Sequence, residues 1–127
     1  MALKDNKYKS KTIFHSFKYA FEGFLYGFRT ATNLLVDILI AIIVMIFGLL
    51  LNLSSIEWIA VVLCFGLVIS LELMNSAVEE VVDMITKEND IKAKRAKDLA
   101  AGAVLFGAIM TSVVGLIIFV PKIINLF

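Results

Sequence analysis

The sequence contains only one cysteine and one proline in 127 residues, and both scarcities narrow the class of protein. Because Cys64 has no second cysteine with which to pair, an internal disulfide or a multi-cysteine metal site is excluded. The single proline, Pro121, leaves the rest of the chain free to form uninterrupted helices. No segment alternates polar and apolar residues as a strand of a membrane barrel would. We therefore predict an all-α protein.

Charged side chains are scarce in three long segments of the chain, and this absence predicts a membrane protein. Hydrophobic residues make up 61% of the sequence, whereas an ordinary soluble domain has roughly 45–50%. Each segment is long enough to cross a hydrocarbon core of about 30 Å as a helix. The predicted transmembrane spans are residues 34–53, 56–75 and 99–120. We treat residues 1–127 as a single membrane domain.

The segment before the first span is too polar to cross a membrane and too aromatic to remain in water. Phenylalanines recur at steps of three and four between Phe14 and Phe28, which is the spacing of one helical face. We expect residues 12–33 to form an amphipathic helix that lies in the membrane interface, preceded by a polar tail at residues 1–11.

Local signals predict where the later helices begin and end. Ser54 and Glu57 have the spacing of a capping box for the second spanning helix, which should continue beyond the membrane to about residue 85. Residues 86–98 should form a charged connection. We expect Asp98 to cap the start of the third spanning helix and Pro121 to stop it.

Basic residues are distributed unevenly around the three spans. Six precede the first span, none lies in residues 52–57, five lie between the second and third spans, and one follows the third. Cytoplasmic flanks of membrane proteins carry the excess of lysine and arginine. We therefore expect the N-terminus and the second connection inside the cell and the C-terminus outside.

The acidic segment at the end of the second span is the strongest functional signal in the sequence. On a helix, its polar side chains fall within about 100° of one another; they are Glu72, Asn75, Ser76, Glu79 and Asp83. Ionisable groups at membrane depth are costly, so this stripe is treated as a functional-site hypothesis. The alternative is that these acids have no function and only form a solvated continuation of the helix.

The predicted topology brings Asp37, Lys97 and Asp98 to the same cytoplasmic level as this stripe. Carboxylate and amide oxygens suit Mg²⁺, which usually binds together with the phosphates of a nucleotide. Phosphoryl transfer needs a metal, positive charge at the phosphates and a base for the acceptor hydroxyl. These residue types could meet all three needs, although the sequence has no Walker A motif, kinase glycine loop or metal-binding histidine pair.

Two blocks of sequence closely resemble the prokaryotic integral-membrane diacylglycerol kinase family: ELMNSAVEEVVD at residues 72–83 and AKDLAAGAV at 96–104. The segments SFKYAFEG at 16–23 and GLIIFVP at 115–121 look like its Gram-positive branch, the undecaprenol kinases. The resemblance implies transfer of the γ-phosphoryl group of ATP to a lipid alcohol in the bacterial cytoplasmic membrane. It also implies a homotrimer whose active sites are shared between subunits. No nucleic-acid partner is expected.

The resemblance further implies roles for individual residues. Glu72 looks like the catalytic base, Asn75 like a supporting polar group and Glu79 like a Mg²⁺ ligand. The positions that match nucleotide contacts are Glu79, Asp83, Lys97 and Asp98. Ala20 and Gly23 match the motif of the surface helix and are expected to lie near the lipid.

One position departs from the family pattern. The family usually has a second metal-ligating glutamate shortly before the first span, and Ala31 stands where that acid is expected. The departure puts metal binding in doubt and leaves a weakened or inactive enzyme as an open alternative.

Three hypotheses about the function therefore stay open. The first is a kinase acting on undecaprenol, diacylglycerol or another lipid alcohol, since apolar pockets discriminate weakly between lipids. The second is a small oligomeric channel or transporter whose acids conduct ions, although the middles of all three spans lack charge. The third is a non-catalytic relative retained for assembly or regulation.

Overall fold

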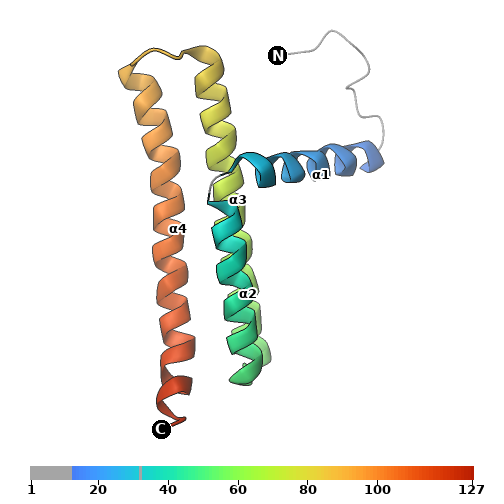
Figure 1. Ribbon diagram of the computed structural model, residues 1–127, viewed down its shortest axis with the longest axis vertical. Coiled ribbons are helices and arrows are strands. Elements are labelled where there is room, and N and C mark those ends of the chain that lie inside the picture. The colour runs from blue at the N-terminus through green and yellow to red at the C-terminus, as the bar shows by residue number, and fades with distance from the viewer. Residues whose placement is uncertain (1–12, 32) are drawn as a thin grey trace.

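The computed structural model describes residues 13–31 and 33–127, which form four helices (Figure 1). In chain order these are α1 (Ile13–Thr30), α2 (Leu34–Leu50), α3 (Ser55–Ile85) and α4 (Ile91–Ile124). The described residues contain no β-strand, and the predicted all-α class is confirmed. The tail predicted at residues 1–11 lies outside the described residues.

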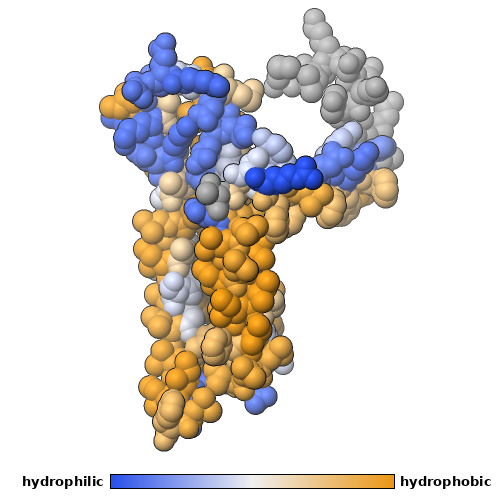
Figure 2. Space-filling model, viewed as in Figure 1, coloured by the Kyte–Doolittle hydropathy of each residue, from blue (hydrophilic) through white to orange (hydrophobic). Residues whose placement is uncertain are grey.

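Helices α2, α3 and α4 run along one another, and α1 lies across them at an angle of 97° to α2 (Figure 1). α3 and α4 both continue past the level of α1 and are joined beyond it (Figure 1). The part of the molecule on one side of α1 is mainly hydrophobic, and the ends of α3 and α4 on the other side are hydrophilic (Figure 2). We refer to these two parts as the stem and the head.

The stem has the length and surface of a membrane-spanning bundle. α3 and α4 are each long and apolar enough to cross a membrane. α2 has 17 residues, the lower end of the range that spans the hydrocarbon core. Two to three segments are therefore apolar and long enough to cross, the third being α1 and α2 counted as one bent span. Large apolar side chains on all three helices are exposed, among them Leu50, Leu63 and Ile117. Such a surface requires lipid or other subunits around it.

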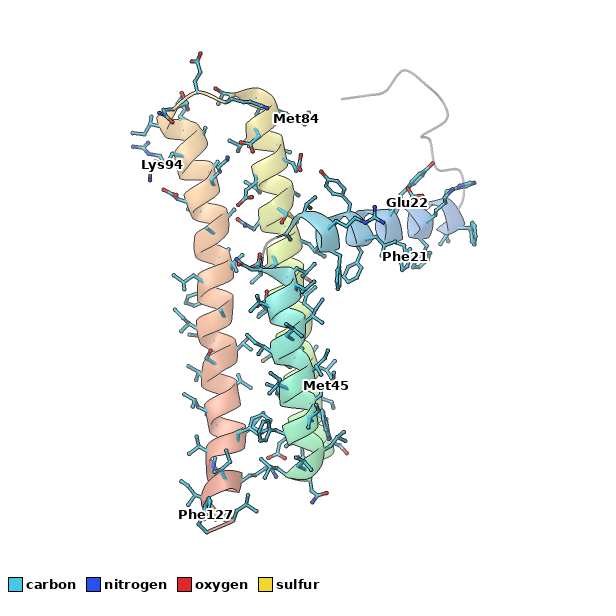
Figure 3. The ribbon with its side chains drawn as sticks, viewed as in Figure 1. Phe21, Glu22, Met45, Met84, Lys94 and Phe127 are labelled. Atoms are coloured by element: carbon cyan, nitrogen blue, oxygen red, sulfur yellow. The ribbon has the colours of Figure 1, made fainter. Side chains whose placement is uncertain are left out.

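α1 is amphipathic, as the phenylalanine spacing predicts. Phe21 and Glu22 point to opposite sides of the helix (Figure 3). The helix ends at Thr30, three residues earlier than predicted. Its apolar side lies toward the stem and its polar side toward the head (Figure 2), which is the orientation that a helix at a membrane interface requires.

α3 is one unbroken helix of 31 residues, about 46 Å long. The predicted capping box is confirmed: the Ser54 backbone N–H donates to Glu57 Oε2 at 2.7 Å, and the Glu57 N–H donates to Ser54 Oγ at 3.3 Å. The predicted end near residue 85 is also confirmed. One rigid element therefore carries the acidic stripe from the stem into the head.

α4 extends further at both ends than predicted. Its N-cap is Asp90 rather than Asp98, because Asp90 Oδ1 accepts the first-turn N–H groups of Lys92 and Ala93 at 2.8 and 2.9 Å. The charged connection therefore contains only residues 86–90. Pro121 lies inside the helix and does not stop it. A proline one turn from a helix end removes a single backbone bond, and the N–H of Asn125 still donates to the Pro121 carbonyl at 3.1 Å.

Candidate functional site

The stripe on α3 faces the space between α1 and α4. A Cβ atom on Gly107 of α4 would collide with Leu71, and one on Gly27 of α1 would collide with Leu73. These contacts place α4 and α1 on opposite flanks of the intervening residue, Glu72. A Cβ atom on Gly23 would meet nothing within 4 Å. The close approach to α1 therefore occurs at Gly27.

Glu72 is the deepest charged residue of the stripe, and only 4% of it is exposed. The carboxyl groups of Asp37 and Glu79 act on its carboxyl group electrostatically, and Asn33, from the α1–α2 junction, lies near it. The prediction that Asp37 and Glu72 share one level is therefore confirmed. Asp37 Oδ2 is buried and has no hydrogen-bond partner within the part of the chain that the structure describes.

One turn further along α3, an amide and a carboxylate lie together. Asn75 Nδ2 donates to Glu79 Oε1 at 3.3 Å. Asn75 Oδ1 is buried and accepts no hydrogen bond from residues 13–31 and 33–127. A buried amide oxygen without a partner is unfavourable unless something else binds it. The pair therefore offers a hard oxygen donor from each residue.

At the head, α3 and α4 enclose a cavity of about 550 Å³ that Asp83, Lys97 and Asp98 help to line. Lys97 Nζ donates to Asp83 Oδ1 at 2.6 Å, and this hydrogen bond and the nearby carboxylates raise the pKa of Lys97. Asp98 pairs with Lys94, which also lines the cavity and lies on the head portion of α4 (Figure 3). The charged residues that line the cavity are three lysines and four acids: Lys87, Lys94, Lys97, Asp83, Glu88, Asp90 and Asp98.

The six residues predicted from the stripe and its partners do not all share one pocket. Asp83, Lys97 and Asp98 surround the head cavity, whereas Glu72, Asn75 and Glu79 lie closer to the stem and do not line it. The sequence reasoning missed Lys94, although its position three residues before Lys97 places both lysines on one helical face.

On the other flank of the stripe, α1 and α3 form a mainly apolar groove of about 610 Å³. Ala20 and Gly23 line it from α1, and Ser76 lines it from α3. Tyr26 Oη donates to Glu80 Oε1 at 2.9 Å and so joins the two helices. The hydrogen bond to Glu80 and the charge of this carboxylate raise the pKa of Tyr26.

Metal binding by protein groups alone is not supported within residues 13–31 and 33–127, where no three histidine, cysteine, aspartate or glutamate residues are close enough to hold an ion. Ala31 is 9% exposed and its N–H donates to the Gly27 carbonyl at 2.8 Å, so the expected acid is replaced by a small buried side chain. The remaining donors, Glu79 and Asn75, fit a cation that also takes oxygens from a phosphate.

Comparison with known proteins extends the resemblance over most of the chain. The family model described as prokaryotic diacylglycerol kinase matches residues 18–119. An undecaprenol kinase of Bacillus subtilis is 42% identical over 122 residues, which are 96% of this chain and 99% of the relative. A diacylglycerol kinase of Synechocystis sp. is 38% identical and the alignment covers 87% and 64% of the two chains. A diacylglycerol kinase of Haemophilus influenzae is 33% identical, with 84% and 93% covered.

Proposed function

Because the chain belongs to the prokaryotic diacylglycerol kinase family and is a lipid kinase, we propose that it transfers the γ-phosphoryl group of ATP to undecaprenol. The product is undecaprenyl phosphate. The observation that carries this proposal is the position of Glu72, a buried carboxyl group at the boundary of the stem and the head, beside α3 residues that line an apolar groove. The choice of undecaprenol rests on the similarity to the B. subtilis enzyme over nearly all of both chains.

In this proposal, Glu72 is the general base. The hydroxyl oxygen of the lipid forms a bond to the γ-phosphorus while the bond from that phosphorus to the β–γ bridging oxygen breaks, and ADP leaves. Glu72 accepts the hydroxyl proton. A base positioned at the acceptor contributes about 10²–10⁴-fold to the rate of such a reaction. Glu72 lies at the boundary of the stem and the head, and this depth suits an alcohol that remains in the membrane.

Glu79 and Asn75 would hold Mg²⁺ together with the nucleotide phosphates. The donor chemistry supports this, because a carboxylate and an unpartnered amide oxygen lie together. When bound, Mg²⁺ neutralises charge on the β- and γ-phosphates. This chain contributes few ligands to the ion, which is the usual mode of magnesium binding beside a nucleotide.

The nucleotide would occupy the head cavity, where Lys97 binds phosphate. Asp83 holds Lys97 Nζ at 2.6 Å and thereby fixes its orientation. Glu79 and Asp98 complete the set of nucleotide-contacting side chains in this proposal.

Lys97→Met is expected to raise the KM for ATP by about 10–100-fold, the effect of losing one charge-assisted hydrogen bond. The matched control is Lys92→Met, an exposed lysine on the same helix that does not line the head cavity. Initial rates measured across ATP concentrations at saturating lipid would separate KM from kcat. An unchanged KM for ATP in the Lys97 variant would contradict the assignment.

The lipid alcohol would enter through the groove between α1 and α3. Ala20 and Gly23 leave this groove open because neither carries a large side chain, and the space above Gly23 is empty. The groove reaches the catalytic stripe at Ser76, which lies on α3 between Glu72 and Glu79 in sequence. An isoprenoid or acyl chain would extend from this groove along the apolar stem.

The enzyme would act as a homotrimer in the bacterial cytoplasmic membrane, with active sites shared between subunits. In support, apolar side chains cover the outside of the stem, and Gly115 of α4 has open space around it. Small residues at four-residue spacing favour close packing of membrane helices. In this proposal the head and the N-terminus lie in the cytoplasm, where ATP is present, and the C-terminus lies outside; the distribution of basic residues supports this orientation.

Transfer of label from γ-labelled ATP in mixed micelles with Mg²⁺ tests this function. Undecaprenol and diacylglycerol are offered in parallel to the purified protein, and we expect labelled undecaprenyl phosphate to form faster than labelled phosphatidic acid. Faster labelling of diacylglycerol would overturn the choice of substrate. The absence of label in any lipid alcohol would overturn the proposed activity.

A further inference from the structure

Of the acids in the block at residues 72–83, only Glu80 has no part in the proposed phosphoryl transfer. Its carboxyl group is instead bound to α1, since Tyr26 Oη donates to Glu80 Oε1 at 2.9 Å. The two residues are 54 positions apart in the sequence, so this bond is a tertiary contact between the surface helix and α3. Both residues line the groove between these helices. The bond therefore belongs to the wall of the groove.

Two neighbouring residues of α1, Tyr26 and Gly27, fasten this helix to α3. Gly27 is buried, and a Cβ atom there would collide with Leu73, so the two helices touch at this point. Tyr26 reaches Glu80, which is seven residues beyond Leu73 and thus about 10 Å further along α3 toward the head. The rest of α1 extends sideways from the bundle (Figure 1). These contacts, together with the junction with α2, hold α1 against α3.

The groove opens between the two contacts. Residues three, four and seven apart on a helix share one face. Between Leu73 and Glu80, the residues of α3 on this face are Ser76 and Ala77, which both line the groove and have small side chains. The two contacts thus frame an opening with a floor of small residues. Ser76 lies one helical turn from Glu72, so an alcohol group in this opening would lie beside the proposed base.

We propose that the hydrogen bond between Tyr26 and Glu80 positions the lipid alcohol, because it holds α1 along the head side of the groove and so keeps the hydroxyl group beside Glu72. This inference rests on the proposed function, which assigns the groove to the lipid substrate. Both partners are exposed, and 54% of Tyr26 is accessible. Loss of the bond leaves no buried polar group unpaired, so it should loosen α1 without unfolding the bundle.

Tyr26→Phe removes the hydroxyl group, leaves the ring and therefore tests the bond alone. We expect the KM for undecaprenol, measured as its mole fraction in mixed micelles, to rise about 3–10-fold, the effect of losing one hydrogen bond. The kcat at saturating lipid and the KM for ATP should keep their wild-type values, because neither partner lines the head cavity. Tyr19→Phe is the matched control, the same change on the same helix in a tyrosine that does not line the groove.

Substitutions of Glu80 separate the bond from a general effect on α1. Glu80→Gln keeps an oxygen that accepts the hydrogen bond and should stay close to the wild type, whereas Glu80→Ala should raise the KM for undecaprenol as Tyr26→Phe does. Combining Tyr26→Phe with Glu80→Ala should cause no further rise, because both changes break the same bond. An unchanged KM for undecaprenol in Tyr26→Phe would overturn the inference. An equal loss of kcat would also overturn it, since general damage to the structure has that effect.

A second measurement does not depend on turnover. The sequence has three tyrosines, so the ultraviolet difference between the wild type and Tyr26→Phe during a pH titration reports the ionisation of Tyr26. The hydrogen bond to Glu80 and the charge of this residue raise the pKa of Tyr26. The same difference taken in a Glu80→Ala background should give a pKa closer to that of an ordinary tyrosine.

An unchanged pKa of Tyr26 in the Glu80→Ala background would show that the bond does not form and would overturn the inference. A lowered pKa together with a raised KM for undecaprenol in Tyr26→Phe would support it. A lowered pKa, in a protein whose wild type phosphorylates no lipid alcohol, would support the contact but refute the proposed function and, with it, the positioning role.

Discussion

Replacing Glu72 with glutamine is expected to lower kcat for lipid phosphorylation by about 10²–10⁴-fold, the contribution of a positioned general base. Glutamine has nearly the same size as glutamate, but it cannot take up the hydroxyl proton. The substitution also removes one negative charge from a site that contains Asp37 and Glu79. Because like charges in a buried site destabilise the fold, the variant should be at least as stable as the wild type.

Initial rates with γ-labelled ATP and undecaprenol would measure this loss, and thermal unfolding in micelles would show that the variant is folded. Glu22→Gln is the matched control, since Glu22 is exposed and lies on the opposite side of α1 from Phe21 (Figure 3). It should retain wild-type turnover. Normal turnover in Glu72→Gln would rule out the base assignment.

The helices could be predicted because their signals are local. The absence of charge over long segments, the phenylalanine spacing and the Ser54–Glu57 capping box each depend on residues a few positions apart. The stripe on α3 was predictable for the same reason, since an unbroken helix fixes which of its side chains share a face.

The start of α4 could not be predicted from residue types, because two aspartates are suitable as its N-cap. Asp90 and Asp98 are both suitable N-caps by residue type. Asp90 caps the helix, and Asp98 instead pairs with Lys94 one turn away on the helix surface. Pro121 was misleading because its effect depends on how much helix follows, and here only about one further turn follows it.

The contacts around Glu72 required the tertiary structure. The lengths of the spans predict that Asp37 and Glu72 share one level, but they do not show that Asn33 lies near Glu72. The pairing of Tyr26 with Glu80 across the α1–α3 groove is also a contact between distant segments.

The arrangement of charge also weighs against an ion-conducting function. Apart from Glu57, which lies at the opposite end of the stem and pairs with Lys122 at 3.1 Å, the acids of α3 lie at the head and at its boundary with the stem. The helices of the stem carry long uncharged segments. A conducting path would need polar groups along the depth of the membrane. Membership of a lipid kinase family favours phosphoryl transfer.

Ala31→Glu should lower the Mg²⁺ concentration needed for half-maximal activity by at least about tenfold. An added carboxylate about 4 Å from a cation contributes a few kcal/mol even when partly solvated, and about 1.4 kcal/mol corresponds to a factor of ten in affinity. The alanine is buried at the end of α1, two positions before Asn33, so the new side chain would begin close to the catalytic stripe.

Lipid phosphorylation measured across Mg²⁺ concentrations would test this, with Ala31→Gln as the control of equal size and no charge. If the wild type is weakly active and Ala31→Glu but not Ala31→Gln restores turnover at low Mg²⁺, the alanine limits metal binding in an otherwise complete kinase site. Equal Mg²⁺ dependence in the wild type and both variants would mean that Glu79, Asn75 and the nucleotide phosphates suffice, because the ion then gains nothing from a second carboxylate.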